Sequence, residues 1–324
     1  MEEKHSILLV VQGGAGDVIA STPMIRGFRR KYPDDKIVVI ATHSFLLEHN
    51  PHIDELISFD QMKDIRSIYT HHIKGEYTVR YFKQHFLYDG FVDDARYMSE
   101  TLPEFICNMY NIDYDDEPLD YTVNTYERDA ATEFMKQFQR PVVLVHPCGV
   151  LPMKSLDFRI LQPIVNRLVE TYDIVQIGQS GEPQLENVHN ALGMPIRDTI
   201  SVMPHAKLCI LIESLFAHVT NALGTQAVVT FQSTDPKFFG YNTNLNVWDS
   251  NGCPEWPCNR PIGPLNRFLP AYLNLNGGES LPWMCPDPKC SKINPEDLEK
   301  TILGALEAKE KNGPFETIQA VPVE

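Results

Sequence analysis

Residues 6–20 read SILLVVQGGAGDVIA, an apolar run followed by a glycine-rich turn and the beginning of a second apolar pattern. The run predicts a buried strand over Ser6–Val11, and the turn predicts the entry into a helix. The glycines of the turn are Gly13, Gly14 and Gly16. They let backbone N–H groups approach a ligand closely, and the helix N-terminus behind them carries partial positive charge. The turn is therefore a candidate binding element.

Asp17 lies in this turn, where a strand–loop–helix connection would hold a carboxylate rigidly at a crevice. An aspartate in this position has an ordinary structural role as well, because its side chain can cap a helix N-terminus. Both roles are open on the residues of the turn alone.

The chain around the turn predicts a βαβ unit. Apolar residues recur at helical spacing over Val18–Tyr32, and further strands are expected at Lys36–Ala41 and Ile53–Phe59. From residue 61 to 120 the chain is rich in aromatic and acidic residues and has weak periodicity. We expect loops and helices that cover the sheet there, and an aromatic pocket for an acceptor is the alternative.

The second half repeats the alternation of strands and helices. A helix over Glu127–Gln139 is expected to lead into it. The expected strands are Pro141–His146, Asp173–Gly178, Lys207–Ile212 and Gln226–Phe231. The expected helices are Phe158–Tyr172, Glu182–Leu192, Ser214–Leu223 and Pro295–Lys309. This alternation predicts a parallel, doubly wound sheet that binds its ligand at the carboxyl ends of the strands.

The length of 324 residues favours two domains of ordinary size. We expect two Rossmann-like domains that face a cleft, one over residues 1–135 and one over 136–311. The second would carry a cysteine-rich segment at 250–292, and residues 312–324 would form a flexible tail.

The charge balance narrows the range of partners. The chain carries 28 Lys+Arg against 43 Asp+Glu, and its net charge of -15 repels phosphate backbones and anionic lipid surfaces at long range. Nucleic acid is therefore not an expected partner. No segment approaches the ~20 apolar residues of a membrane span. We expect a cytoplasmic protein without integral membrane contact.

Polar residues follow the predicted strands of the second half, at the edge where the carboxyl ends of parallel strands meet. The candidate site residues there are Lys154, Gly178, Glu182, Glu213, Ser214, His218, Thr234 and Asp235. A lysine for phosphate charge, a helix N-terminus at Ser214 for phosphate oxygens and a glutamate for ribose hydroxyls would together hold a nucleotide diphosphate. Singly these residues are ordinary, because Ser214 could be only a helix N-cap and Lys154 only a solvated loop residue.

Two other classes of nucleotide-binding protein fit poorly. A dinucleotide-binding turn needs a third glycine where Ile19 stands, and the second strand ends in Ile40-Ala41-Thr42 without an acid for a ribose hydroxyl. A P-loop needs a lysine followed by serine or threonine after the glycines, and this chain has none there.

The motifs resemble those of glycosyltransferase family nine, the ADP-heptose:lipopolysaccharide heptosyltransferases. In the first half the similar residues are Ile7–Val11, Gly16-Asp17-Val18, Thr22-Pro23, Arg26, Tyr32-Pro33 and Asn50–Glu55. In the second half they are Lys154, Gly178, Glu182, Glu213-Ser214, His218, Thr234-Asp235-Pro236 and Tyr241. The resemblance spans about residues 6–60 and 141–300.

The resemblance implies a GT-B fold and an inverting transfer, with the acceptor on the first domain and a nucleotide sugar on the second. Asp17 would be the catalytic base, while Lys154 and the helix end at Ser214 would stabilise the leaving diphosphate without a divalent cation. The chain departs from the family pattern at Glu213, where the family has aspartate, and at Leu215, where it has glycine. Ser155-Leu156 stands in place of the family's Trp-Pro. ADP-heptose is the donor that the family implies.

Four late cysteines form two Cys-x4-Cys pairs in a proline-rich segment. They are Cys253, Cys258, Cys285 and Cys290. Four thiols in a reducing compartment predict a structural zinc or iron site, and disulfides or unpaired thiols are the alternatives. Part of the family that the motifs resemble carries an iron site of this kind, in members whose acceptor is a protein.

The sequence thus predicts an inverting glycosyltransferase that moves a sugar, heptose by family resemblance, from a nucleotide diphosphate donor to a glycan or protein hydroxyl. The family's role implies lipopolysaccharide biosynthesis. No catalytic cofactor is expected, and association into an oligomer is open. The alternatives are a related transferase with a UDP- or GDP-sugar donor and a catalytically silent nucleotide-sugar-binding or assembly protein of the same fold.

Overall fold

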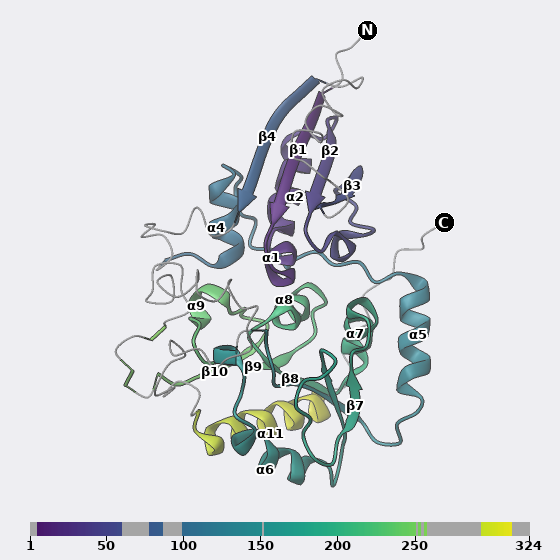
Figure 1. The fold of residues 1–324 in the computed structure, drawn as a ribbon, viewed down its shortest axis with the longest axis vertical. Coiled ribbons are helices and arrows are strands. Elements are labelled where there is room, and N and C mark those ends of the chain that lie inside the picture. The colour runs from purple at the N-terminus through teal and green to yellow at the C-terminus, as the bar shows by residue number, and fades with distance from the viewer. Residues whose placement is uncertain are drawn as a thin grey trace. The chain divides into compact units, whose positions relative to one another are not determined.

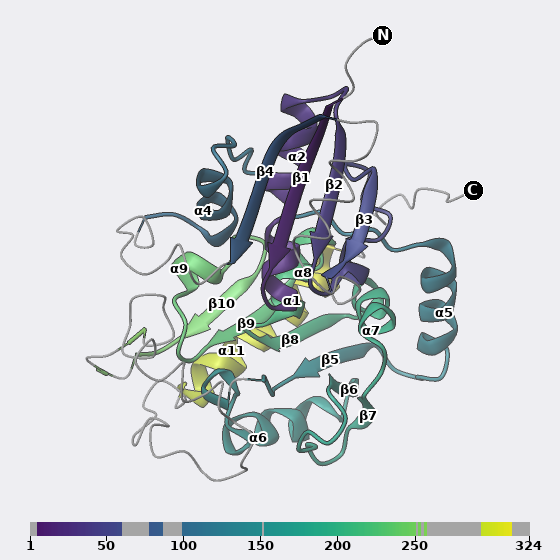
Figure 2. The same cartoon turned by 45° about the horizontal axis from the view of Figure 1, so that its top comes forward.

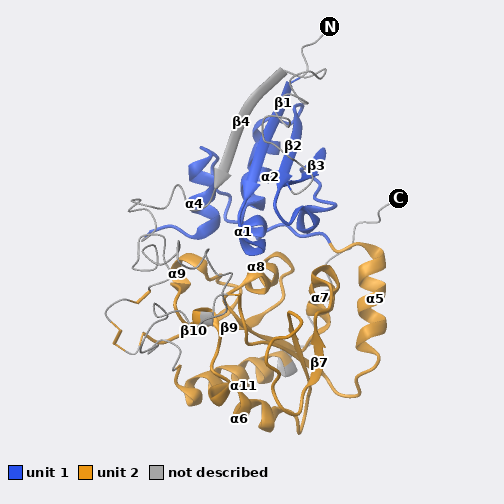
Figure 3. Cartoon of the chain, in the orientation of Figure 1, with its two compact units in different colours: residues 1–122 blue, residues 123–324 orange. Residues whose placement is uncertain are grey.

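The computed structural model describes residues 5–59, 78–86, 99–150, 152–250, 252–253, 256–257 and 293–312. The chain divides into two compact units, Met1–Thr122 and Val123–Glu324, which Figure 3 colours blue and orange. Each unit contains its own β-sheet. None of the described helices combines the length and the apolar content that crossing a bilayer requires.

Unit 1 is built on a parallel sheet of four strands (Figure 1). The strands are β1 (His5–Gln12), β2 (Lys36–Ala41), β3 (Glu55–Ser58) and β4 (Thr78–Phe86), in the order β3-β2-β1-β4. The helical elements are α1 (Ala15–Ala20), α2 (Thr22–Lys31), η1 (Ser44–Leu47) and α4 (Leu102–Met109). The predicted βαβ unit is confirmed, although its single expected helix is divided at Ser21 into α1 and α2.

Strands β1 and β2 bury nearly every residue, because both faces of the sheet are covered. Leu8 and Val10 pack with Val38 and Ile40 on one face. The parallel register aligns Val10 with Ile40 and Val11 with Ala41. The glycine-rich turn after β1 thus begins from a rigid, buried strand.

The prediction for residues 61–120 was wrong in one respect, since Thr78–Phe86 forms β4 and pairs in parallel with β1. This segment reads TVRYFKQHF and mixes charged residues with β-formers, so it shows neither strict alternation nor an apolar run. Pairing with a strand distant in the sequence gives it a structure that local periodicity does not reveal.

Unit 2 contains a parallel sheet of six strands in the order β10-β9-β8-β5-β6-β7 (Figure 2). The strands are β5 (Val142–His146), β6 (Asp173–Gly178), β7 (His189–Leu192), β8 (Leu208–Ile212), β9 (Ala227–Phe231) and β10 (Leu245–Trp248). The helical elements are α5 (Thr125–Met135), η4 (Pro152–Lys154), α6 (Phe158–Leu168), α7 (Ile196–Val202), η5 (Met203–His205), α8 (Leu215–Ala222), α9 (Pro236–Phe239) and α11 (Pro295–Asn312). The four strands expected from the sequence are confirmed.

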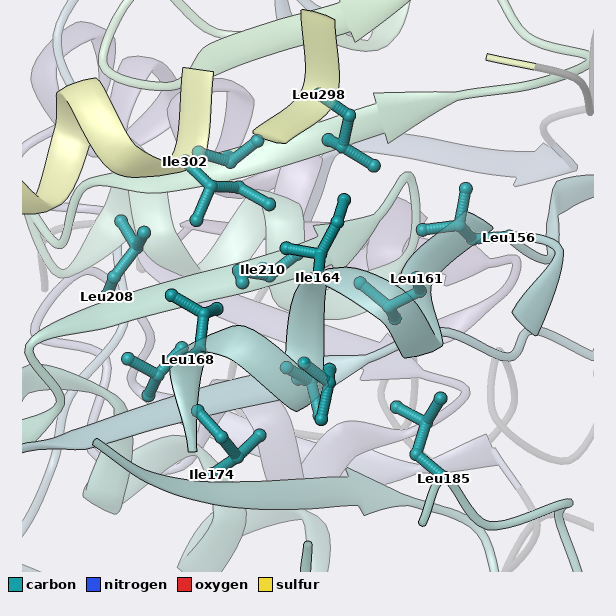
Figure 4. Packing of buried hydrophobic residues seen from close by; sticks show 14 of the residues in the cluster. Leu156, Leu161, Ile164, Leu168, Ile174, Leu185, Leu208, Ile210, Leu298 and Ile302 are labelled. Atoms are coloured by element: carbon teal, nitrogen blue, oxygen red, sulfur yellow. The ribbon is translucent and has the colours of Figure 1, made fainter. Parts of the chain in front are cut away.

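The core of unit 2 joins α6 and α11 to one face of this sheet (Figure 4). Leu161, Ile164 and Leu168 of α6 meet Ile210 of β8 and Ile302 of α11 in one buried cluster. The strands β5, β8 and β9 are buried at every position, so the opposite face is covered as well. The doubly wound sheet that the sequence predicts is therefore present.

One local expectation differs from the structure. Glu182–Leu192 is not a helix: a loop is followed by β7, and α7 begins only at Ile196. Helix α5, which is expected from the sequence to lead into the second half, lies in unit 2, where it packs against α7 and its Glu127 forms an ion pair with Arg197. The expected tail falls almost entirely on residues outside the described ones.

Candidate functional site

Both sheets reverse their strand order at one point, and the candidate residues gather there. In unit 1 the chain moves from β1 outward to β2 and β3 and then returns to place β4 on the other side of β1. In unit 2 the same reversal separates β5 from β8. Ligands of open parallel sheets bind outside the carboxyl ends of the strands at such switch points.

The turn after β1 lies at the switch point of unit 1 and is tied to the next loop. The Gly13 N–H donates to the Thr42 hydroxyl oxygen at 3.1 Å, and that hydroxyl donates to the Gly13 carbonyl at 2.8 Å. Thr42 directly follows β2, so the loops after two neighbouring strands are joined. Gly16 lies within helix α1, one residue before Asp17.

Asp17 lies in the first turn of α1 and is half-buried. Its Oδ2 accepts a hydrogen bond from the Gly14 N–H at 2.8 Å, so the side chain at the third helical position satisfies the backbone N–H of the N-cap residue. A Cβ at Gly14 would lie 3.4 Å from this oxygen, in ordinary contact. The capping role considered from the sequence is therefore real, and the contact fixes the orientation of the carboxylate.

In unit 2 a hydrogen bond crosses the switch point. His146 is the last residue of β5, and Ser214 precedes α8 just after β8. The Ser214 hydroxyl oxygen and His146 Nδ1 lie 3.3 Å apart. Ser214 is the N-cap residue of α8, but its side chain forms this bond instead of a capping bond. Burial lowers the pKa of His146 to about 4, so the imidazole is neutral at pH 7.

Lys154 and Glu213 form a buried ion pair at the same edge. Lys154 ends the short η4 turn after β5, and its Nζ lies 2.6 Å from Glu213 Oε2. The side chains are 19% and 3% exposed. The Lys154 ammonium also lies 5.5 Å from the centroid of the Phe239 ring, which comes from α9. The structure thus brings together the candidate lysine and glutamate.

His218 is buried in α8, where its Nδ1 lies 2.6 Å from the Tyr241 hydroxyl oxygen. Burial is the main cause that lowers its pKa to about 4, while the charges of Glu213 and Lys154 act in opposite directions. The ring is therefore neutral at pH 7 and close enough to the ion pair to sense both charges.

The Glu182 carboxyl group packs against the backbone of Gly178, the last residue of β6. A Cβ at position 178 would lie 2.1 Å from Glu182 Oε2, and Gly178 has φ of +152°, so a side chain is excluded there. Burial raises the pKa of Glu182. Burial, with a smaller effect from the same carboxylate, raises the pKa of Cys148 to about 11, which leaves that thiol protonated.

The residues after β9 divide into two kinds. Asp235 accepts a hydrogen bond from the Lys237 N–H at 2.8 Å and so caps α9. The buried hydroxyls of Ser233 and Thr234 have no hydrogen-bond partner in the described part of the chain. The Trp256 indole N–H donates to the Gln232 carbonyl at 2.7 Å, which joins the start of the cysteine-rich segment to this edge.

The predicted metal site lies mostly outside the described residues. Cys253 is described and has a free thiol, whereas Cys258, Cys285 and Cys290 are not described. Among the described residues no group of three or more potential ligands gathers. The four-cysteine site stays a prediction, which elemental analysis of the purified protein would test.

Two residues of the site were not among the predicted site residues. His146 ends β5 at the edge where polar residues are expected from the sequence, and its bond to Ser214 gives it a place at the switch point. Phe239 was missed altogether. It is one helical turn beyond Asp235, and an aromatic residue in the short helix after a polar strand end is the signal that could have identified it.

No protein-family model matches the chain, and no curated protein matches it by sequence. Solved structures do match it. The glycosyl transferase family 9 protein from Veillonella parvula has a TM-score of 0.70 at 18% identity, over 95% of this chain and 99% of that one. The ADP-heptose lipopolysaccharide heptosyltransferase II of E. coli has a TM-score of 0.63 at 14% identity, over 94% and 99%.

A third match is the iron-containing dodecameric glycosyltransferase TibC of enterotoxigenic E. coli, with a TM-score of 0.66 at 12% identity over 96% of this chain and 78% of that one. TibC has also been solved in complex with ADP-D-β-D-heptose. These matches confirm at the level of fold the resemblance carried by the sequence motifs. The chain has the GT-B fold of the glycosyltransferases of family nine.

Proposed function

We propose that the chain is an inverting glycosyltransferase, in which unit 2 binds a nucleotide diphosphate sugar and unit 1 supplies the catalytic base. The observation that carries the proposal is the convergence of Lys154, Glu213 and the N-terminus of α8 at the switch point of unit 2. This is where a parallel sheet binds its ligand, and the lysine and the helix end are both suited to phosphate. The shared fold with known glycosyltransferases supports the reaction class.

In this proposal the donor's diphosphate contacts the Lys154 ammonium and the first backbone N–H groups of α8. Glu182 accepts the ribose hydroxyls, since its Oε2 is buried and has no hydrogen-bond partner in the described part of the chain. Thr234 and the buried Ser233 lie at the neighbouring strand end, and His218 offers a neutral imidazole. ADP-heptose is the proposed donor, because heptosyltransferases share the fold.

The transfer is a single in-line displacement. An acceptor hydroxyl attacks the anomeric carbon as the bond from that carbon to the diphosphate oxygen breaks, which inverts the configuration. Asp17 takes the proton of the hydroxyl, and its carboxylate is oriented for this by the bond from the Gly14 N–H. Charge that develops on the leaving diphosphate is stabilised by Lys154 and by the α8 N-terminus. The proposed acceptor is a hydroxyl of a glycan, such as a lipopolysaccharide core, or of a protein.

The donor site is tested by thermal shift and calorimetry with ADP-, GDP-, UDP- and CDP-sugars. We expect one class to bind, and Lys154→Met to weaken that binding by about tenfold or more, because a charge-assisted phosphate contact is lost. Lys136→Met is the matched control, since Lys136 is 64% exposed on α5 and its loss leaves the site intact. Equal binding by native chain and Lys154→Met would refute the assigned site, and binding without turnover of any sugar would identify a silent binding protein.

A further inference from the structure

The Glu213 carboxylate already forms an ion pair with Lys154, and an anionic ligand that binds Lys154 would have to disturb this pair. Glu213 directly follows β8, and its N–H donates to the Thr230 carbonyl of β9 at 3.0 Å, which fixes its backbone at the sheet edge. Its side chain is 3% exposed, and the charge that it contacts is the Lys154 ammonium at 2.6 Å. The lysine proposed for phosphate is thus already neutralised by an internal anion.

The ion pair with Glu213 and the binding of a phosphate group are partly incompatible for Lys154, for electrostatic reasons. A diphosphate on the ammonium would bring further negative charge toward a carboxylate that is shielded from solvent, and like charges in such a place repel strongly. If the ligand instead draws Lys154 away, Glu213 stays behind as a buried charge without its partner. In either case Glu213 opposes the binding of phosphate groups.

We propose that Glu213 is an internal competitor of the donor's diphosphate for Lys154. This inference rests on the proposed function of unit 2. A diphosphate can contact Lys154 and the α8 N-terminus at once, and the second contact within one ligand offsets part of the free energy lost when the ion pair is disturbed.

The alternative role of Glu213 is to accept hydrogen bonds from hydroxyl groups of the ligand, and the two roles predict opposite effects when the Glu213 charge is removed. If Glu213 accepts hydroxyls of the ligand, its neutralisation weakens binding, because the carboxylate is the stronger acceptor. If Glu213 competes with phosphate, its neutralisation strengthens binding. The direction of one affinity change therefore distinguishes the two roles.

The experiment measures, by calorimetry, the binding of the di- and monophosphates of adenosine, guanosine, uridine and cytidine to the native chain and to Glu213→Gln. For the base that binds, we expect Glu213→Gln to tighten diphosphate binding by about tenfold. Monophosphate binding should tighten as well, because the carboxylate opposes any phosphate group placed on Lys154. Lys136→Met again serves as the surface control.

The outcomes separate the two proposals. Diphosphate binding by the native chain with equal or weaker binding by Glu213→Gln overturns the competitor role and leaves the proposed function in place. No binding of any nucleotide to either protein overturns the proposed function, and the competitor role with it. Tighter binding by the variant supports both.

A second pair of variants decides the question if Glu213→Gln does not fold. Lys154→Met leaves Glu213 buried without its cation, whereas Lys154→Met with Glu213→Gln leaves no unpaired charge, so the double variant should have the higher Tm. Neither protein has a cation to compete for, so this comparison measures the repulsion between Glu213 and phosphate alone: the double variant should bind diphosphate more tightly than Lys154→Met. Equal or weaker binding by the double variant would overturn the repulsion on which the competitor role depends.

Discussion

At the scale of single residues, the carboxylate of Asp17 has two tasks that can be separated. It accepts a hydrogen bond from the Gly14 N–H and so completes the N-terminus of α1. The proposed transfer asks it to accept a proton as well. An asparagine offers a carbonyl oxygen of the same reach for the first task but no basic group for the second.

Asp17→Asn should therefore slow transfer strongly without unfolding α1. We expect the rate of sugar transfer to fall by about a hundredfold or more, as for the loss of a general base, while donor affinity and Tm stay close to native values. Asp17→Ala, which removes the cap as well, should lose a further ~1 kcal/mol of stability. Transfer by Asp17→Asn at the native rate would exclude Asp17 as the base. The measurement is a steady-state assay with the donor identified by the binding screen.

At the scale of elements, buried strands could be predicted from the sequence and long-range pairings could not. Strand β6 has the predicted bounds Asp173–Gly178, because a β-branched apolar run bounded by a glycine is a local signal. The segment that begins at Glu182 was predicted to be helical but is held as a loop by Gln176. The Gln176 amide N–H donates to the Pro183 carbonyl, and its Oε1 accepts from the Leu185 N–H, both at 2.8 Å. Such a side chain acting on a distant backbone leaves no trace in periodicity.

The candidate site could be predicted in its location but not in its contacts. Parallel strands place their carboxyl ends at one edge, so the polar residues after β5, β6, β8 and β9 were expected there. Which of them meet depends on the η4 turn, which carries Lys154 to Glu213, and on α9, which places Phe239 beside the ammonium. Both elements are short and have little sequence signature.

A buried ion pair joins helix α5 to helix α7, and breaking this pair should lower the free energy of unfolding. Arg197 of α7 and Glu127 of α5 have side chains 12% and 8% exposed, and Glu127 also accepts from the Asn124 N–H at 2.9 Å. Arg197→Met leaves Glu127 buried without a cation, so we expect a loss of about 3 kcal/mol in the free energy of unfolding.

A matched lysine-to-methionine change at an exposed ion pair should have almost no effect. Lys136 pairs with Glu133 on the surface of α5, where the two side chains are 64% and 71% exposed. Lys136→Met should change the free energy of unfolding by less than about 0.5 kcal/mol. Urea unfolding of both variants measures the contrast, and equal effects would show that the Arg197 pair does not hold α5.

At the scale of the whole molecule, two opposing charge effects set the response to acid. The net charge of -15 is reduced as carboxylates take up protons, which eases repulsion within the folded chain. The buried imidazoles of His146 and His218 act in the other direction. Their pKa values are lowered from 6.5 to about 4 in the folded protein, so between these values the unfolded chain binds more protons.

The two histidines should therefore make the protein lose stability as the pH falls from 6.5 to 4. Each contributes a slope of up to about 1.4 kcal/mol per pH unit, which vanishes above the unfolded-state pKa. His218→Asn keeps a polar group beside Tyr241 but cannot titrate, so its stability should depend less steeply on pH than that of the native chain. Urea unfolding at several pH values compares the two, and identical slopes would contradict a buried, neutral His218.

The strands that are covered on both faces also limit how far sequence comparison can detect a shared fold. A position such as Val143 or Val229 asks only for an apolar, branched side chain of suitable volume, so valine, isoleucine and leucine can replace one another there over time. The amino-acid sequence of such a strand can therefore change while its backbone structure stays the same. The chain shares 14% of its residues with E. coli heptosyltransferase II, yet the structural match to that protein covers 94% of this chain. In strands that are covered on both faces, likeness of fold is therefore carried by strand order and burial rather than by the identity of the core residues.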